Sequence, residues 1–266
     1  MIFHPRTLSF IKASACGNDF LLIDAGLGPA DMGDFTRRIC DRHDGVGANG
    51  VEWMLPHASA DAEVRLINAD GSEAEISGNG TRCVAAYLCA ERGGGTIRIQ
   101  TGAGLKTCSL MGRRDSEYEF EMEMGKAGLG GELTIRLGND QVRGVSVSLG
   151  NPHCVVFVSE FENNWQALAA EIQRDPQFKQ GVNVELVIAE NTNAVRALFF
   201  ERGVGETRSS GTGSCAAAVA AVETGRASWP VRVHAPGGTQ TVRKEEDRVF
   251  LRGPARLLCR GEFFLE

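Results

Sequence analysis

The sequence predicts a mixed α/β (α+β) fold built from two similar halves, and three observations lead to this prediction. Short motifs recur at a constant spacing of 133 residues, two segments have the composition of buried helices, and many strand-like segments surround them. The recurring elements are the turns Ser77-Gly-Asn-Gly and Ser210-Gly-Thr-Gly, the pairs Gly17-Asn18 and Gly150-Asn151, and the single positions Glu73 with Glu206 and Asn68 with Glu201. Chance repeats one glycine-rich turn easily, but not several separated elements at one spacing. We therefore expect a duplicated architecture whose matched turns face one another.

Two segments are apolar nearly all round, which is typical of buried helices. The first predicted helix covers Thr81–Glu91 and ends at the glycines 93–95. Its counterpart covers Cys215–Val222 and consists of small apolar residues. We expect each helix to be wrapped by a barrel-like or sandwich-like sheet.

The rest of the chain alternates between strand-like segments and turns. It opens with strands at Leu8–Ala13 and Phe20–Asp24, a helix at Asp34–Arg42 and a tight loop marked by the glycines 45, 47 and 50. A further helix is predicted at 165–174, and further strands at 61–68, 96–101, 106–110, 117–124, 132–137, 142–148, 154–158, 184–188, 194–200, 231–235, 240–243, 248–252 and 256–259.

A cluster of glycines at 125, 128, 130 and 131 predicts the boundary between the halves. We expect one half at residues 1–127 and the other at 128–266, with the last strands able to return to the first half. Because no low-complexity linker separates them, the halves are expected to pack closely.

Composition excludes several function classes. A net charge of −6 without a basic run argues against nucleic acid and anionic membranes as partners, and no apolar run is long enough to span a bilayer. The eight cysteines form no C-x-x-C pair and the histidines show no zinc spacing, so no metal is expected. Without an export signal, we expect free thiols and a cytoplasmic location.

The two Ser-Gly-x-Gly turns each precede a predicted helix. Helix N-termini offer unpaired N–H groups and a partial positive charge, and glycine lets a ligand approach the backbone closely. Two such ends would bind a carboxylate or phosphate well. The alternative is that each serine only caps its helix. Neither turn is a Walker A loop, a nucleophile elbow or a Rossmann fingerprint.

Polar residues around these turns suit a small zwitterionic ligand. Such a ligand needs amides, a carboxylate for its ammonium group and an arginine for its carboxylate. The candidates are Asn18, Asn68, Asn151, Asn183, Glu201 and Arg202, with His153 nearby. Alternatively, the asparagines are turn residues and Glu201 with Arg202 forms a surface ion pair.

Longer motifs of the chain resemble the diaminopimelate epimerases, amino-acid epimerases of bacterial lysine and peptidoglycan synthesis. The matching stretches are GNDFLLID at 17–24, RHDGVGANG at 42–50, NADGSEAEISGNGTRC at 68–83, GNPHCVVFV at 150–158, GVNVEL at 181–186 and ERGVGETRSSGTGSCAAAVAA at 201–221. They cover almost the whole chain in the family's order.

The resemblance implies two pseudo-symmetric domains, each a strand barrel around a central helix, with the active site in the cleft between them. It implies interconversion of LL- and meso-diaminopimelate by α-proton transfer between two bases, without a cofactor, and a homodimer at the level of the family. The implied side-chain contacts to this small-molecule substrate are Asn18, Asn68, Asn151, Asn183, Glu201 and Arg202. Backbone groups of Gly78, Asn79, Gly211 and Thr212 are implied to hold the α-carboxylate.

One departure from the family pattern affects the chemistry. The family has a cysteine before each G-x-G, and the resemblance implies that these two cysteines exchange the α-proton; this chain has Ser77 and Ser210 there. A thiol has a pKa of about 8.5, and a hydroxyl roughly five pKa units weaker costs about 7 kcal/mol more to ionise. Cys83 and Cys215 lie inside the predicted helices and are expected to be packing residues.

Three explanations are open. The serines at the catalytic positions can be activated by a neighbouring proton acceptor, for which His153, Glu201, Glu73 and Glu206 are candidates. The site can serve another cofactor-independent racemase, isomerase or dehydratase that uses a carboxylate or histidine base. The protein can also bind an amino acid without turnover, including the case that both thiols were removed deliberately.

Overall fold

The computed structural model of the chain describes residues 6–138 and 140–265. Within these residues, secondary structure recurs at the same 133-residue spacing as the motifs. The paired elements are β2 (Asn18–Asp24) with β11 (Pro152–Phe157), α1 (Met32–Cys40) with α3 (Trp165–Gln173), β3 (Gly50–Leu55) with β12 (Asn183–Asn191), β4 (Ala62–Asn68) with β13 (Ala194–Glu201), β5 (Glu73–Ala74) with β14 (Gly205–Thr207), and α2 (Gly78–Arg92) with α4 (Gly211–Glu223). The predicted α/β duplication is confirmed.

The chain forms two compact units. Unit 2 is Glu123–Gly253, and unit 1 combines the described residues of Met1–Met122 with those of Pro254–Glu266. Two strands, β8 (Glu117–Lys126) and β17 (Arg248–Leu265), contribute residues to both units. Each unit is described by itself below.

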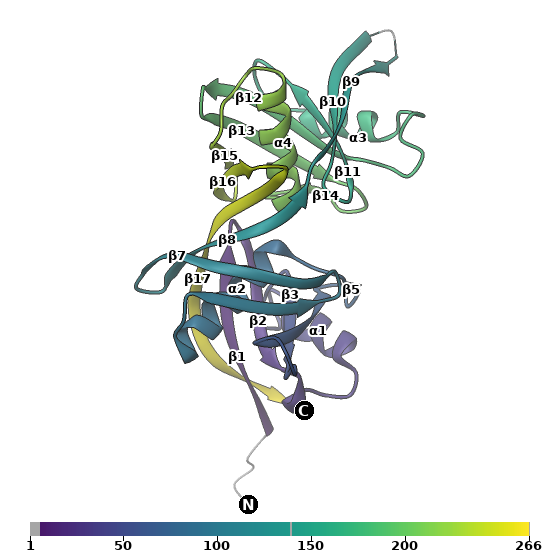
Figure 1. The fold of residues 1–266 in the computed structure, drawn as a ribbon. Helices are drawn as coiled ribbons and strands as arrows, with labels where there is room; N and C mark the ends of the chain where they lie inside the picture. The colour runs from purple at the N-terminus through teal and green to yellow at the C-terminus, as the bar shows by residue number, and fades with distance from the viewer. Residues whose placement is uncertain (1–5, 139, 266) are drawn as a thin grey trace, which may run out of the picture. The chain divides into compact units, whose positions relative to one another are not determined.

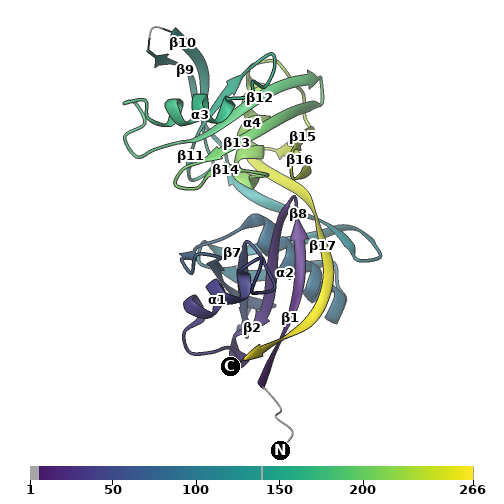
Figure 2. The same cartoon turned by 180° about the vertical axis from the view of Figure 1, so that it is seen from behind.

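Eight strands of unit 1 close into a barrel. In ring order they are β1 (Arg6–Ala15), β2, β3, β4, β6 (Thr96–Thr101), β7 (Gly104–Arg114), β8 and β17, and β17 pairs with β1 to complete the ring. Helix α2 lies within this ring of strands (Figures 1 and 2). Because strands surround it, its residues from Asn79 to Cys89 are buried except Tyr87, which explains why its sequence is apolar on nearly every side.

The outer face of this barrel is covered by α1. Phe35 and Ile39 of α1 pack in one cluster with Leu21 and Trp53 from β2 and β3. The indole N–H of Trp53 donates to the buried Thr36 Oγ1 at 3.1 Å, so the polar edge of this large side chain is satisfied. A short 3-10 helix, η1 (Ala25–Leu27), connects β2 toward α1.

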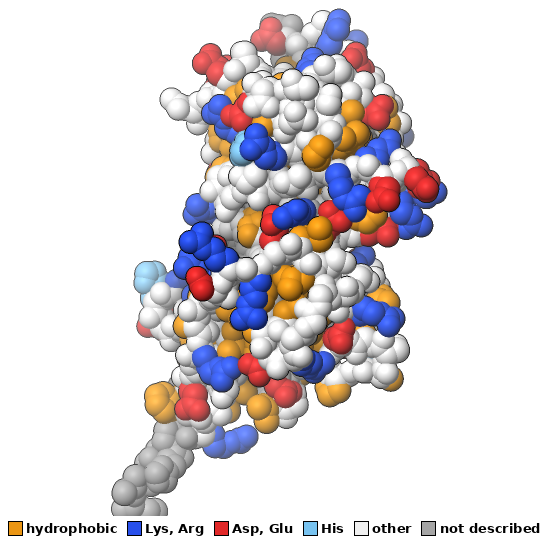
Figure 3. Space-filling view, turned by 60° about the vertical axis from the view of Figure 1, so that its left-hand side comes forward, with side chains coloured by type: hydrophobic (Ala, Val, Ile, Leu, Met, Phe, Trp, Pro, Cys, Tyr) orange, Lys and Arg blue, Asp and Glu red, His pale blue; other side chains and the backbone are white. Residues whose placement is uncertain are grey.

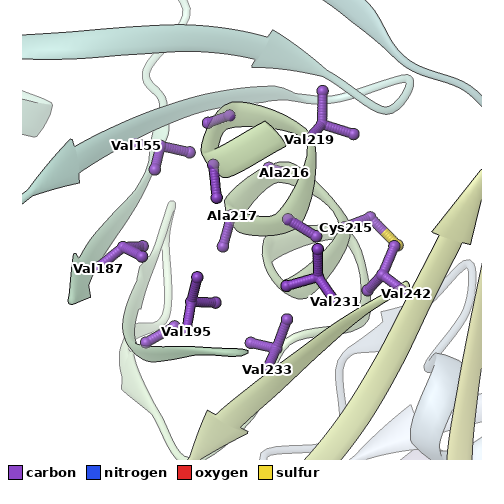
Figure 4. Packing of buried hydrophobic residues seen from close by; sticks show 14 of the residues in the cluster. Val155, Val187, Val195, Cys215, Ala216, Ala217, Val219, Val231, Val233 and Val242 are labelled. Atoms are coloured by element: carbon purple, nitrogen blue, oxygen red, sulfur yellow. The ribbon is translucent and has the colours of Figure 1, made fainter. Parts of the chain in front are cut away.

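Unit 2 repeats this arrangement around α4. Its strands pair in the order β9 (Gly128–Leu137), β10 (Asp140–Ser148), β11, β12, β13, β15 (Val231–Ala235), β16 (Gly238–Glu245) and β17. Figure 4 shows valines of these strands, among them Val155, Val187 and Val233, pointing at the helix that carries Ala216 and Ala217. The alanines of α4 have small side chains, so the branched side chains of the strands approach its backbone closely.

Three details of the predicted secondary structure were wrong. Gly50 was assigned to a loop, but it begins β3, a strand buried along most of its length and therefore without the alternation of a half-exposed strand. The predicted helices Thr81–Glu91 and Cys215–Val222 begin earlier, at Gly78 and Gly211, because the serine before each glycine is the true cap. The strands 248–252 and 256–259 are one continuous strand, β17.

The surface carries charges of both signs, and nearly all of the cysteines are buried. Acidic and basic side chains are interspersed on the face drawn in Figure 3. In the part of the chain that the structure describes, no helix is long and apolar enough to cross a membrane. All eight cysteines are free thiols, and only Cys259 is exposed.

Candidate functional site

Ser77 and Ser210 are the N-cap residues of α2 and α4. Both have extended backbone dihedrals, and the Oγ of each accepts a hydrogen bond of 3.1 Å from the amide three residues later, that of Gly80 or Gly213. The capping role considered from the sequence is therefore real. The capping hydrogen bond uses a lone pair of each serine oxygen and leaves the hydroxyl proton unused, so each O–H group can still donate.

The first residues of both helices present backbone amides that have no intrahelical partner. Gly78 and Asn79 begin α2, and Gly211 and Thr212 begin α4. A side chain added at Gly78 would meet nothing within 4 Å among the described residues, so the backbone is accessible there. These paired helix starts have the partial positive charge that binds carboxylates.

In unit 1, two of the predicted asparagines lie in one hydrogen-bonded chain. Asn79 Nδ2 donates to Asn18 Oδ1 at 2.6 Å, and the guanidinium of Arg82 donates to Asn79 Oδ1. Arg82 is fully buried and also reaches the carbonyl of Pro254 at 3.3 Å. Asn68 lies at the end of β4, where its Nδ2 donates to Ser72 Oγ at 3.1 Å.

In unit 2, Asn151 and Thr212 form the corresponding contact. Asn151 Nδ2 donates to Thr212 Oγ1 at 3.4 Å, and Asn151 Oδ1 lies 3.0 Å from Nε2 of His153. The other ring nitrogen of His153 lies 2.7 Å from Oε1 of Glu185, and both side chains are buried. Both nitrogens of this imidazole are thus already engaged.

Glu201 and Arg202 do not form the surface ion pair that the sequence left open. Arg202 is exposed, its Nη1 donates to the carbonyl of Gln180 at 2.7 Å, and its backbone N–H donates to Asn183 Oδ1 at 2.9 Å. The carboxylate of Glu201 instead accepts a hydrogen bond from the side chain of Ser210. Burial raises the pKa of Glu201 above its ordinary value, and a hydrogen bond from Ser210 and the proximity of His153 partly offset that effect.

The two other carboxylates considered as proton acceptors lie on the surface. Glu73 is exposed and pairs with Arg65 at 3.1 Å. Glu206 is exposed and accepts a hydrogen bond of 2.9 Å from Gln166 Nε2. Among the described residues, no group of three acidic, cysteine or histidine side chains is placed to hold a metal ion.

Sequence reasoning missed a matched pair of buried carboxylates. Glu52 in β3 and Glu185 in β12 keep the 133-residue spacing, and both lie behind the third residue of the following helix, Gly80 or Gly213. The available signal was one glutamate in each of two apolar strands, GVEWML and NVELVI. Burial raises the pKa of both side chains, that of Glu52 to about 8.

Gly80→Ala is expected to lower the free energy of unfolding by about 1–3 kcal/mol. An added Cβ at Gly80 would overlap the Oε1 atom of the buried Glu52, which has little room to move. The matched control is Gly78→Ala, where the Cβ meets nothing and alanine favours the helix. Urea denaturation measures both variants. Equal effects of the two would show that the Glu52 carboxyl does not occupy this space.

A sequence model of the family described as "Diaminopimelate epimerase" matches residues 10–129 and 145–258. The chain belongs to the diaminopimelate epimerase family. The diaminopimelate epimerase of Desulfitobacterium hafniense is 36% identical over 275 residues, with 96% of this chain and 97% of that protein covered. That of Pelotomaculum thermopropionicum is 37% identical over 278 residues, covering 96% and 99%.

Solved structures outside the diaminopimelate epimerase family share the fold at low sequence identity. A phenazine biosynthesis protein of the PhzF family from Bacillus anthracis has a TM-score of 0.71 at 17% identity, covering 98% of this chain and 100% of that one. A hydroxyproline epimerase from Agrobacterium vitis, with bound trans-4-hydroxy-L-proline, has a TM-score of 0.71 at 18% identity, covering 98% and 93%. These likenesses establish the architecture.

Proposed function

We propose that the chain epimerises diaminopimelate without a cofactor. Membership of the family and the names of the relatives support this assignment. The observation that carries it is the duplicated helix start: Ser77 and Ser210 each cap a helix whose next amides are suited to a carboxylate.

The remaining polar groups define the substrate contacts that we propose. Amides of Gly78, Asn79, Gly211 and Thr212 hold the α-carboxylate. The side chains that bind the rest of the zwitterion are Asn18, Asn68, Asn151, Asn183, Glu201 and Arg202. A carboxylate bound at two positive helix ends also stabilises negative charge that develops at the adjacent α-carbon.

We propose that Ser210 and Glu201 work together as the base on one face of the α-carbon. Ser210 Oγ takes the α-proton while its own hydroxyl proton passes to the Glu201 carboxylate, and the C–H electron pair stays on the substrate. Ser77 donates its hydroxyl proton to the opposite face. The Ser77 alkoxide then takes a proton from water and Glu201 releases its proton to water, which restores both groups, and the reverse reaction runs the same transfers backwards. The hydrogen bond between Ser210 and Glu201 supports this assignment, and the raised pKa of Glu201 makes it a stronger proton acceptor.

A second candidate function is amino-acid binding without turnover. It is favoured by the capping contacts, because both serine oxygens accept a backbone N–H and thus have a structural role that needs no catalysis. We also propose a cytoplasmic location, and a homodimer by the likeness to the family.

Deuterium exchange separates these functions. In D2O the protein is expected to incorporate deuterium at the α-carbon of LL- and meso-diaminopimelate, and Glu201→Gln is expected to slow the exchange about 100-fold while calorimetry still detects binding. Glu206→Gln, a change of an exposed carboxylate, is expected to leave the rate within about twofold, since exposed charges couple weakly. Binding without exchange in the unmodified protein would support the second candidate.

A further inference from the structure

Four polar side chains of unit 2 form one continuous hydrogen-bonded chain from its interior to the start of α4. Glu185 of β12 contacts His153 of β11 at 2.7 Å, His153 contacts Asn151 at 3.0 Å, and Asn151 contacts Thr212 at 3.4 Å. Glu185 and His153 are buried. Of these four residues, only Asn151 and Thr212 are among the proposed substrate contacts, and the buried pair has no contact with substrate.

The direction of this chain follows from which atoms can donate. Asn151 uses its NH2 group toward Thr212, so its carbonyl oxygen faces His153 and requires a donor there. If Glu185 is ionised, His153 donates from both nitrogens as an imidazolium. If Glu185 is protonated, it donates to Nδ1 and Nε2 still carries the proton. Nε2 is therefore an N–H donor in either state.

We propose that Glu185 and His153 are positioning residues that orient the Asn151 amide and, through it, the hydroxyl of Thr212. Thr212 Oγ1 accepts from Asn151, so its own proton points away from Asn151 and is presented as a donor at the helix start. This inference rests on the proposed function, because the group that Thr212 would bind is the substrate carboxylate. It also excludes His153 as the proton acceptor of Ser210, since neither ring nitrogen is available.

Unit 1 also orients an amide beside its helix start, but with different residues and in the opposite direction. There the buried cation is Arg82, which donates to Asn79 Oδ1, and Asn79 in turn donates to Asn18. The 133-residue spacing places Phe20 where unit 2 has His153, and Cys215 where unit 1 has Arg82. In unit 1 the helix residue Asn79 donates to Asn18, whereas in unit 2 Asn151, the counterpart of Asn18, donates to the helix residue Thr212. Each unit thus has a buried donor that fixes one amide beside its helix start.

The charges around His153 fit this role. Glu185 contacts Nδ1, and Glu201 lies near enough for the imidazole to lower the pKa of that carboxyl. Burial is the main cause of the raised pKa of Glu185, and the nearby Glu201 carboxylate adds to it, while His153 opposes it.

The first test reads the protonation of His153 directly and needs no substrate. Nitrogen-15 NMR of the imidazole, assigned by its loss in His153→Gln, is expected to show a protonated Nε2 from pH 6 to pH 8. A bare Nε2 in this range would overturn the proposal whatever the protein binds. If calorimetry finds no binding of diaminopimelate to the unmodified protein, the proposed function fails, and this NMR result still decides the direction of the chain.

The second test is a double-mutant cycle on diaminopimelate binding, measured by calorimetry. His153→Leu and Thr212→Val are each expected to weaken binding by roughly tenfold, the upper range for one hydrogen bond, and the double variant by little more than either single one. His153→Gln, which keeps an N–H donor, is expected to restore binding to within about threefold, a fraction of one hydrogen bond. Additive losses in the double variant would overturn the proposal.

Two further variants make this cycle interpretable. His153→Leu leaves the buried Glu185 without its partner and could prevent folding. The cycle is therefore repeated with Glu185→Gln added, which removes the buried charge. This background tests the same coupling if His153→Leu alone does not fold. The matched control is Glu52→Gln at the equivalent position of unit 1. In that background Thr212→Val is expected to keep its full tenfold effect, and a lost effect there would show that the coupling is not carried by His153.

Discussion

Replacing Ser77 and Ser210 together by cysteine is expected to raise the rate of diaminopimelate epimerisation by several orders of magnitude. A thiol ionises near pH 8.5, and a helix N-terminus lowers its pKa further. A hydroxyl base that costs about 7 kcal/mol more to form corresponds to a rate lower by roughly 10⁵. Loss of α-hydrogen from meso-diaminopimelate in D2O, followed by NMR, measures the change. In the proposed mechanism the Ser210–Glu201 pair recovers part of this deficit, so the gain is expected to be smaller than the full factor.

Single variants provide the control for this experiment. In the proposed mechanism each proton-transfer cycle uses a group on both faces of the α-carbon, so one cysteine is expected to yield far less than two. Ser77→Ala with Ser210→Ala should abolish exchange and also cost about 1 kcal/mol of stability per lost cap. A doubly substituted protein that folds and binds diaminopimelate, yet shows no exchange, would refute the assignment of these positions.

Glu52→Gln is expected to stabilise the protein at alkaline pH and to flatten the dependence of stability on pH. The side chain is fully buried, and burial raises its pKa from 4.5 to about 8. Between these values the folded state holds a proton that the unfolded state has released, so stability falls by about 1.4 kcal/mol per pH unit as pH rises. Above pH 8 both states are ionised and the loss levels off. Glutamine is neutral throughout and removes this slope, with a net gain of order 2–3 kcal/mol at pH 8.

Urea denaturation at pH 5 and at pH 8 measures this difference. The comparison variant is Glu185→Gln, in which the buried carboxyl lost is the partner of His153. That change breaks a buried pair and is expected to destabilise the protein at both pH values. Parallel pH profiles of the unmodified protein and Glu52→Gln would mean that Glu52 is ionised in the folded state at neutral pH.

The sequence predicted the duplication because turns and helix starts are local features that survive in short motifs. The Ser-Gly-x-Gly turns predicted that Ser77 and Ser210 precede two helices. The apolar sequence of these helices predicted that each is surrounded by strands. Strand β3 was missed because a strand buried along most of its length lacks alternation, and its first residue, Gly50, follows two loop glycines. Continuity of β17 depends on pairing with β1, which is distant in the sequence.

The candidate site was predictable as residue types but not as a network. The asparagines near the turns were recognised, whereas Arg82 was assigned to an apolar helix and its role was not seen. The role of Arg82 depends on its contacts with Asn79 and with Pro254, and Pro254 is 172 residues away in the sequence. Glu52 and Glu185 carried the repeat spacing, but only the packed strands show that Glu185 contacts His153.

The eight-strand ring of unit 1 has a consequence for synthesis on the ribosome. Its closing segment is the end of β17, which pairs with β1 through Leu265, opposite Arg6. Unit 2 ends at Gly253, so its residues leave the exit tunnel ahead of that segment and the C-terminal half can complete its sheet first. The half that is translated first must therefore wait, with an open seam along β1, until the end of β17 leaves the exit tunnel.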